Sequence, residues 1–251
     1  MTRLIGIRAP AKPATLPQSR AVMQECSPID VAADPRVRLG VSAAALLVTA
    51  MAVHRNRVGS WEARAFQAVN GLPDSLQVPA WAVMQLGTIG AVPAAAGAAW
   101  LAGDGELAGR LLVSGTGTWA LSKLIKQVVR RPRPVTLLPT TRTRGRDAAG
   151  LGYLSGHAGV AVALGAAALP RLGPVGRALT LSAVPAVGLT RVYVGAHLPL
   201  DIAGGAALGL TVDGAVSLIV SSARRARRRP AAAELGVTAC SRIGPGSEYC
   251  S

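Results

Sequence analysis

The chain has 251 residues, of which 50% are apolar, with a mean hydropathy of +0.38 and a formal net charge of +15. Only 16% of the residues are charged, and they gather at the two ends and between apolar runs. This pattern is typical of a membrane bundle rather than a soluble core. Nucleic acid is not expected as a partner, because the basic residues form no single stripe and only 3% of the chain is aromatic.

The three cysteines, Cys26, Cys240 and Cys250, lie in the polar tails. They form no CxxC pair or Cys/His cluster that would indicate zinc, and an odd number argues against a disulfide framework. We expect free thiols in a reducing compartment.

Apolar runs separated by polar turns predict an all-α integral membrane bundle of about six transmembrane helices, since a span needs about 20 apolar residues. The segment 61–70 carries its apolar residues on one face and predicts a short interfacial helix. Gly205 and Gly209 have GxxxG spacing, which favours close helix packing. The expected spans are 39–53, 76–101, 107–129, 157–169, 177–194 and 197–220.

The spans divide the chain into three parts. Residues 1–35 lack the compact apolar core of a signal peptide and are expected to be a disordered cytoplasmic leader. Residues 36–223 are the predicted membrane domain. Residues 224–251, which begin with a cluster of arginines, are expected to be a basic, disordered cytoplasmic tail.

Basic loops prefer the cytoplasm, and this preference sets the expected orientation. With six spans, the leader, the arginine cluster 224–229 and the turn 170–176 all fall on one side of the membrane. Both termini are therefore predicted to be cytoplasmic. The polar stretches 126–133 and 191–201 then meet on the extracytoplasmic face, where we expect the functional site.

Two histidines, His157 and His197, each stand where an apolar segment begins. Asp201 follows His197 by four residues, a spacing that puts both side chains on one face of a helix. A carboxylate there can hold one imidazole nitrogen and leave the other more basic. His197, His157 and Asp201 are therefore the candidate catalytic residues.

Basic residues near these histidines suit phosphate. Arg133 and Arg191 can each fork onto two phosphate oxygens, and Lys126 supplies a point charge. Ser155 and Gly156 stand at a predicted helix start, where backbone N–H groups can cradle an anion. The combination predicts a phosphate-handling site at a membrane surface.

Three segments resemble the signatures of the type 2 phosphatidic acid phosphatase family. They are Lys126-Gln-Val-Val-Arg-Arg-Pro-Arg133-Pro134, similar to Lys-x6-Arg-Pro; Leu154-Ser-Gly-His157, similar to Pro-Ser-Gly-His; and Thr190-Arg191-x5-His197-x3-Asp201, similar to Ser-Arg-x5-His-x3-Asp. Leu154 stands where the family has Pro and could soften the turn that aims Ser155, and Thr190 stands where it has Ser. Neither position carries charge or transfers a proton.

The resemblance implies a lipid phosphate or lipid diphosphate phosphatase that needs no metal ion or other cofactor. His197 is then the expected nucleophile, Asp201 holds its tautomer, and His157 is the acid and later the base. The chain also has no carboxylate cluster suited to Mg²⁺. A polyprenyl diphosphate, phosphatidylglycerol phosphate and phosphatidic acid remain open as substrates. The Ala-, Arg- and Gly-rich composition favours a bacterial cytoplasmic membrane.

Two alternative functions use the same residues. Vanadium haloperoxidases share the signature but are soluble, which six apolar spans argue against. A non-catalytic lipid-phosphate binder or transporter would keep the cationic cradle without turnover.

Other charged residues receive structural interpretations. Arg130 and Arg131 are interpreted as a charged stop at a membrane boundary, and Asp213 as a structural residue inside a span. Arg142, Arg144 and Arg146 either grip a second phosphate or head group or form a solvated loop face.

Overall fold

The computed structural model describes residues 34–145 and 150–240, and side chains as far as residue 226. Within these residues every regular element is helical, and sheet pairing is limited to one isolated bridge between Pro132 and Leu151. The all-α prediction is therefore confirmed. Most of the predicted leader, the end of the predicted tail, and Arg146 lie outside the described residues.

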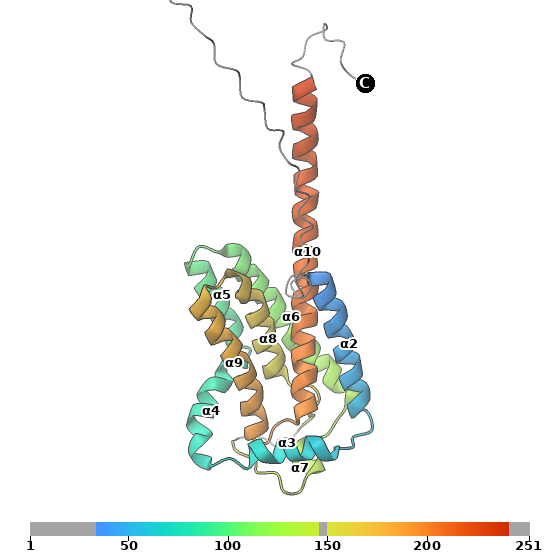
Figure 1. The fold of residues 1–251 in the computed structure, drawn as a ribbon, viewed down its shortest axis with the longest axis vertical. Helices are drawn as coiled ribbons and strands as arrows, with labels where there is room; N and C mark the ends of the chain where they lie inside the picture. The colour runs from blue at the N-terminus through green and yellow to red at the C-terminus, as the bar shows by residue number, and fades with distance from the viewer. Residues whose placement is uncertain (1–33, 146–149, 241–251) are drawn as a thin grey trace, which may run out of the picture.

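Long helices stand side by side in a bundle, and α3 lies across one end of it (Figure 1). The elements are α2 (Pro35–Val53), α3 (Ser60–Asn70), η1 (Asp74–Leu76), α4 (Gln77–Met84), η2 (Gln85–Gly87), α5 (Ala91–Leu101), α6 (Gly105–Val129), α7 (Pro134–Leu137), α8 (Gly156–Ala168), η3 (Leu169–Arg171), α9 (Pro174–Tyr193) and α10 (Pro199–Cys240).

The short helix α8 lies at the centre of the bundle and packs against α6, α9 and α10. Eight of its 13 residues are buried. A Cβ atom at Gly205 of α10 would lie 2.3 Å from the Ser155 carbonyl oxygen, and one at Gly209 would lie 2.4 Å from the Gly159 carbonyl oxygen. The two glycines therefore let α10 touch the backbone of α8, as their GxxxG spacing predicts.

The predicted span 76–101 is not one straight helix. Its two parts, Asp74–Gly87 and Ala91–Leu101, meet at 65°. Glycine weakens a helix, and a Cβ at Gly87 would lie 2.5 Å from the carbonyl oxygen of His157. The break therefore lets η2 contact the first turn of α8.

Helix α10 continues to Cys240, past the end expected at residue 220. Basic residues close a membrane-crossing stretch, but Arg and Ala are both good helix formers, so the helix itself does not stop at the arginines. The apolar part of the helix ends before Arg224. The boundaries of the membrane domain stay a prediction.

Two described helices, Pro35–Val53 and Pro199–Ala226, are long and apolar enough to cross a membrane, and the bent α4–α5 pair would make a third. The central helix α8 is too short to cross a bilayer core alone. The count of six spans also needs α6, α8 and α9, and it stays a prediction.

Asp213, buried in the middle of α10, binds two arginines from other helices. Arg110 of α6 donates to its carboxylate through Nε and Nη2, at 2.9 and 2.8 Å. Arg38 of α2 lies 3.0 Å from the same carboxylate. Asp213 is therefore a structural residue, as predicted, and its buried charge links α2, α6 and α10.

We predict that Asp213→Asn destabilises the bundle, because the two arginines then lack a counter-charge. Removing one partner of a buried ion pair costs about 3 kcal/mol or more. The melting temperature of the purified protein in detergent measures the effect. Glu106→Gln is the matched control, because Glu106 is 42% exposed in its pairs with Arg171 and Arg224 and should contribute about 1 kcal/mol or less. Equal melting temperatures for the two variants would contradict the prediction.

Candidate active site

The residues of the three signatures meet at one end of the bundle. The C-terminal ends of α6 and α9 and the N-terminal ends of α8 and α10 all lie there, next to α3 (Figure 1). The loop between α6 and α8 folds back onto itself at this end, since Gly152 N–H donates to the Arg131 carbonyl at 2.7 Å.

Ser155 is the N-cap of α8, and its hydroxyl accepts a hydrogen bond from Ala158 N–H at 3.4 Å. Its own backbone N–H donates to the Asp201 carbonyl at 2.9 Å. Leu154, where the family has Pro, is fully buried in an apolar cluster with Tyr153 and Leu208. The turn that aims Ser155 is therefore fixed by packing and by a hydrogen bond to α10, without the proline.

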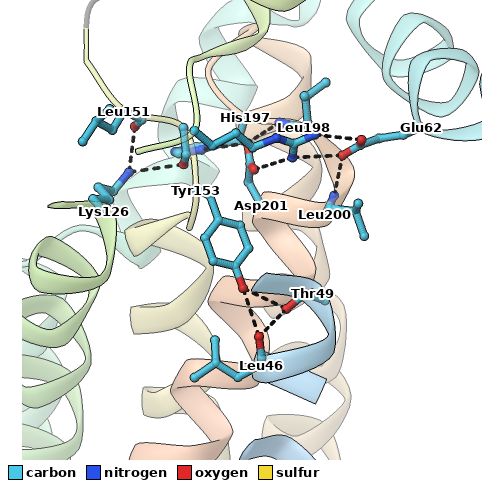
Figure 2. Close-up of polar contacts among 12 residues, drawn as sticks. Leu46, Thr49, Glu62, Lys126, Leu151, Tyr153, His197, Leu198, Leu200 and Asp201 are labelled. Carbon is cyan, nitrogen blue, oxygen red and sulfur yellow. Dashed lines mark hydrogen bonds and ion pairs between the residues drawn. The ribbon is translucent and has the colours of Figure 1, made fainter. Parts of the chain in front are cut away.

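His197 and Asp201 lie together in the interior. Nδ1 of His197 is 3.7 Å from Oδ2 of Asp201, longer than a hydrogen bond, and it has no other partner within the described residues. Oδ2 accepts from Leu198 N–H at 2.9 Å, and Oδ1 accepts from Arg131 Nη1 at 2.7 Å. Figure 2 shows Asp201 directly below His197 at the start of α10. The imidazole thus faces a carboxylate that the protein holds from its far side.

Arg131 holds that carboxylate, and its interpretation as a charged stop is wrong. Its side chain is fully buried, and Nη1 and Nη2 also donate to the two oxygens of Glu62 at 3.2 and 2.9 Å. Glu62 belongs to α3 and accepts a further bond from Leu200 N–H at 3.1 Å (Figure 2). A line of contacts therefore runs from α3 through Arg131 and Asp201 to His197.

The signal for Glu62 was present in the sequence. Glu62 and Asn70 stand four residues on either side of Phe66, so all three share one face of α3, and all three are buried. Trp61, at the start of the same helix, is 54% exposed. A search for apolar residues alone does not find Glu62 and Asn70, although both belong to the buried face.

Burial and neighbouring charges determine the protonation of Arg131 and His197, which both lie outside the helices. Burial alone would lower the pKa of Arg131, but its hydrogen bonds and the charges of Glu62 and Asp201 raise that pKa above its usual value. Burial lowers the pKa of His197 to about 4, although the nearby Asp201 carboxylate acts in the opposite direction. His197 is therefore neutral near pH 7.

The three predicted cations lie near one another, and two of them lie near both histidines. Lys126 Nζ donates to the carbonyls of Leu151 and Gly152 at 3.1 and 3.4 Å (Figure 2). The charges of Lys126, Arg133 and Arg191 lie close enough to interact with one another, and those of Lys126 and Arg191 reach both histidines. The eight predicted residues lie at the same end of the bundle, linked by these charge interactions and by the bond from Ser155 N–H to the Asp201 carbonyl: Lys126, Arg133, Ser155, Gly156, His157, Arg191, His197 and Asp201.

No group of three His, Cys, Asp or Glu side chains suited to a metal ion is found among the described residues. Two cavities flank the α4–η2 segment beside the site. An apolar groove of about 970 Å³ lies between α5, α6, α8 and α9, and Thr88 and Leu172 are among the residues that line it. A more polar cavity of about 770 Å³ includes Arg191 in its wall.

A buried His–Asp pair, a second histidine at a helix N-terminus and three cations lie at one end of an apolar helical bundle, and this combination of charges suits an anion. Residues 107–225 match the PAP2 superfamily.

Among its relatives is the decaprenylphosphoryl-5-phosphoribose phosphatase of Mycobacterium tuberculosis, which is 36% identical over 121 residues. The match covers 47% of this chain and 66% of the relative, just under two thirds of its length.

Two solved structures share the fold at 21% identity. The transmembrane PAP2-type phosphatidylglycerolphosphate phosphatase of Bacillus subtilis has a TM-score of 0.55, covering 74% of this chain and 96% of its own. Aquifex aeolicus LpxE has a TM-score of 0.56, covering 64% and 96%. Both confirm the helical membrane-protein fold.

The lowered pKa of His197 predicts a pH-dependent stability. Between an unfolded pKa of 6.5 and a folded pKa of about 4, the unfolded chain binds more protons at this residue, so stability falls as the pH falls. His197 should contribute about 1 kcal/mol of loss per pH unit in this window. Melting temperatures of the wild type and His197→Gln from pH 7 to pH 4.5 measure this share. Parallel curves for the two proteins would contradict a buried, neutral His197.

Proposed function

We propose that this chain is a metal-independent membrane phosphatase that removes a terminal phosphate from a lipid through a phosphohistidine. The observation that carries the proposal is the buried Asp201 carboxylate, which Arg131 fixes on one side and which faces His197 Nδ1 on the other. His157, Lys126 and Arg191 lie close enough to the same imidazole for their charges to act on it. The match to the PAP2 superfamily and the phosphatase names of the relatives support this reaction.

The proposed reaction has two steps. In the first, Nε2 of neutral His197 attacks phosphorus while Nδ1–H turns toward Asp201, and His157 gives a proton to the leaving oxygen. Arg133, Arg191 and Lys126, together with the N-terminus of α8, stabilise the phosphoryl oxygens. In the second, His157 takes a proton from water, which attacks the phosphohistidine and releases inorganic phosphate and free His197.

The relatives support a lipid substrate and widen the choice among lipids. Polyprenyl diphosphate, phosphatidylglycerol phosphate and phosphatidic acid remain candidates, and the mycobacterial relative adds a sugar phosphate carried by a polyprenyl phosphate. The apolar groove between α5 and α9 offers a hydrocarbon chain a place beside the site, because η2 lines one end of the groove and contacts the His157 carbonyl.

We propose that the site faces the extracytoplasmic side of a bacterial cytoplasmic membrane. The start of α2 and the end of α10 both point away from the end of the bundle that holds α3 (Figure 1). Arg224 and Arg225 follow the apolar part of α10, and a basic flank favours the cytoplasm. Both termini would then be cytoplasmic and opposite to the site.

The alternative of a non-catalytic binder is less well supported. Its only encouragement in the sequence is Leu154, a residue that could soften the turn at Ser155, and other contacts hold that turn. The haloperoxidase alternative is disfavoured by the membrane-protein fold.

We predict that His197→Ala abolishes phosphate release while the variant stays folded, because no other described side chain takes its place opposite Asp201. Purified protein in detergent with EDTA is assayed for inorganic phosphate against the four candidate lipids and a soluble phosphate ester. Melting temperature and elution volume control for folding. Release by His197→Ala at the wild-type rate would contradict the nucleophile, and release by the wild type only without EDTA would contradict a metal-independent reaction.

Arg131 is predicted to be a positioning residue that acts through Asp201. Arg131→Lys should lower kcat about 10-fold or more with little change in KM, because one ammonium cannot bridge Glu62 and Asp201 together. The neighbouring Arg130 is exposed and its side chain donates to the Gln127 carbonyl at 2.9 Å, so Arg130→Lys is the matched control. A purely structural role would lower the amount of folded protein and leave kcat per folded molecule intact.

A further inference from the structure

The polar cavity beside Arg191 is larger than a phosphate needs. Its volume is about 770 Å³, and α4, η1, the loop 143–145 and the C-terminal end of α9 form its walls. Ala196, the neighbour of His197, also lines it. A group attached to a phosphate at His197 and Arg191 would therefore project into this cavity.

Arg144 lines the cavity, but its charge is paired within the protein and its nitrogens already have partners. Its side chain is only 5% exposed, and Nε pairs with Asp74 at 2.8 Å. The other nitrogens donate to the backbone carbonyls of Asn70, Leu72 and Tyr193, each at 2.7 to 2.8 Å. The guanidinium also stacks on the Tyr193 ring at 4.2 Å. The idea that Arg144 grips a second phosphate is therefore not supported.

Neutral polar groups face the rest of the space. Ser75, Gln77 and Thr143 line the cavity, and none of these side chains forms a hydrogen bond with another described residue. A hydroxyl or an amide can both donate and accept, which suits a ligand with several hydroxyl groups. Trp81 adds an indole that is 60% exposed, a flat apolar face against which a ring can pack.

We propose that this cavity is a head-group subsite for a neutral, hydroxyl-rich group, such as a sugar, that carries the terminal phosphate. The inference rests on the proposed phosphatase function and deepens it. The described wall contains two arginines, of which Arg144 is neutralised by Asp74 and Arg191 is needed for the reacting phosphate. A second phosphate joined directly to the reacting one, as in a diphosphate, would meet the Asp74 carboxylate without a free cation.

The test compares a lipid whose terminal phosphate is carried by a sugar with a lipid whose phosphate has no further head group. One is a polyprenylphosphoryl pentose 5-phosphate, and the other is phosphatidic acid, in which the phosphate has no further head group. Trp81→Ala and Gln77→Ala should each lower kcat/KM for the pentose lipid about 10-fold, because polar and stacking contacts to the head group are lost. The value for phosphatidic acid should stay within twofold of the wild type, as roughly expected for a residue that touches only the head group.

Trp100→Ala is the matched control, since Trp100 is 70% exposed on α5 and lines neither cavity. A Trp81 that serves only as a membrane anchor would lower activity on both lipids equally, and that result would overturn the proposal. Preference for a polyprenyl diphosphate over the pentose lipid would overturn it too.

A binding measurement separates this inference from the reaction itself. Affinities of both lipids for His197→Ala, with and without Trp81→Ala, are measured in detergent by microscale thermophoresis. Trp81→Ala should weaken binding of the pentose lipid about 10-fold and leave phosphatidic acid unchanged. Absence of phosphate release by the wild type together with this selective binding would refute the phosphatase and keep the subsite. Equal weakening for both lipids would refute the subsite.

Discussion

The ion network of Glu62, Arg131 and Asp201 is the constraint on which the site depends. All three side chains are buried, and an unpaired charge in such a place costs several kcal/mol. The network is therefore stable only when α3, the loop after α6 and α10 are all in place. The same three elements put the Asp201 carboxylate opposite the Nδ1 atom of His197. Assembly of the fold and positioning of the imidazole are thus one physical event.

Close helix packing brings the second histidine to this network. Gly205 and Gly209 let α10 touch the backbone of α8, and the Ser155 N–H then reaches the Asp201 carbonyl. His157 is two residues further on, in the first turn of α8. Side chains larger than hydrogen at either glycine would separate the two helices, and with them the two histidines.

The sequence predicted the parts of the site that local spacing determines. The helix start at Ser155 and the glycine pair of α10 appear as expected, and His197 lies beside Asp201. The predicted shared helix face is wrong, because α10 begins at Pro199 and His197 precedes it. Arg131 could not be predicted in this way. A buried arginine and a charged stop both follow an apolar helix, and only Glu62, 69 residues earlier in the chain, distinguishes them.

The contacts of the loop around Arg144 could not be predicted either, because the partners are also distant in the sequence. Arg144 is neutralised by Asp74 and also donates to carbonyls of the α3–α4 connection and of α9, and these partners became apparent only from the fold.

The most direct test of the proposed mechanism is to quench turnover of a ³²P-labelled lipid phosphate in the presence of EDTA and to locate the label by mass spectrometry. The account predicts an acid-labile, base-stable phosphoryl group on His197. Label on another residue, or rapid turnover with no trapped phosphohistidine, would contradict it.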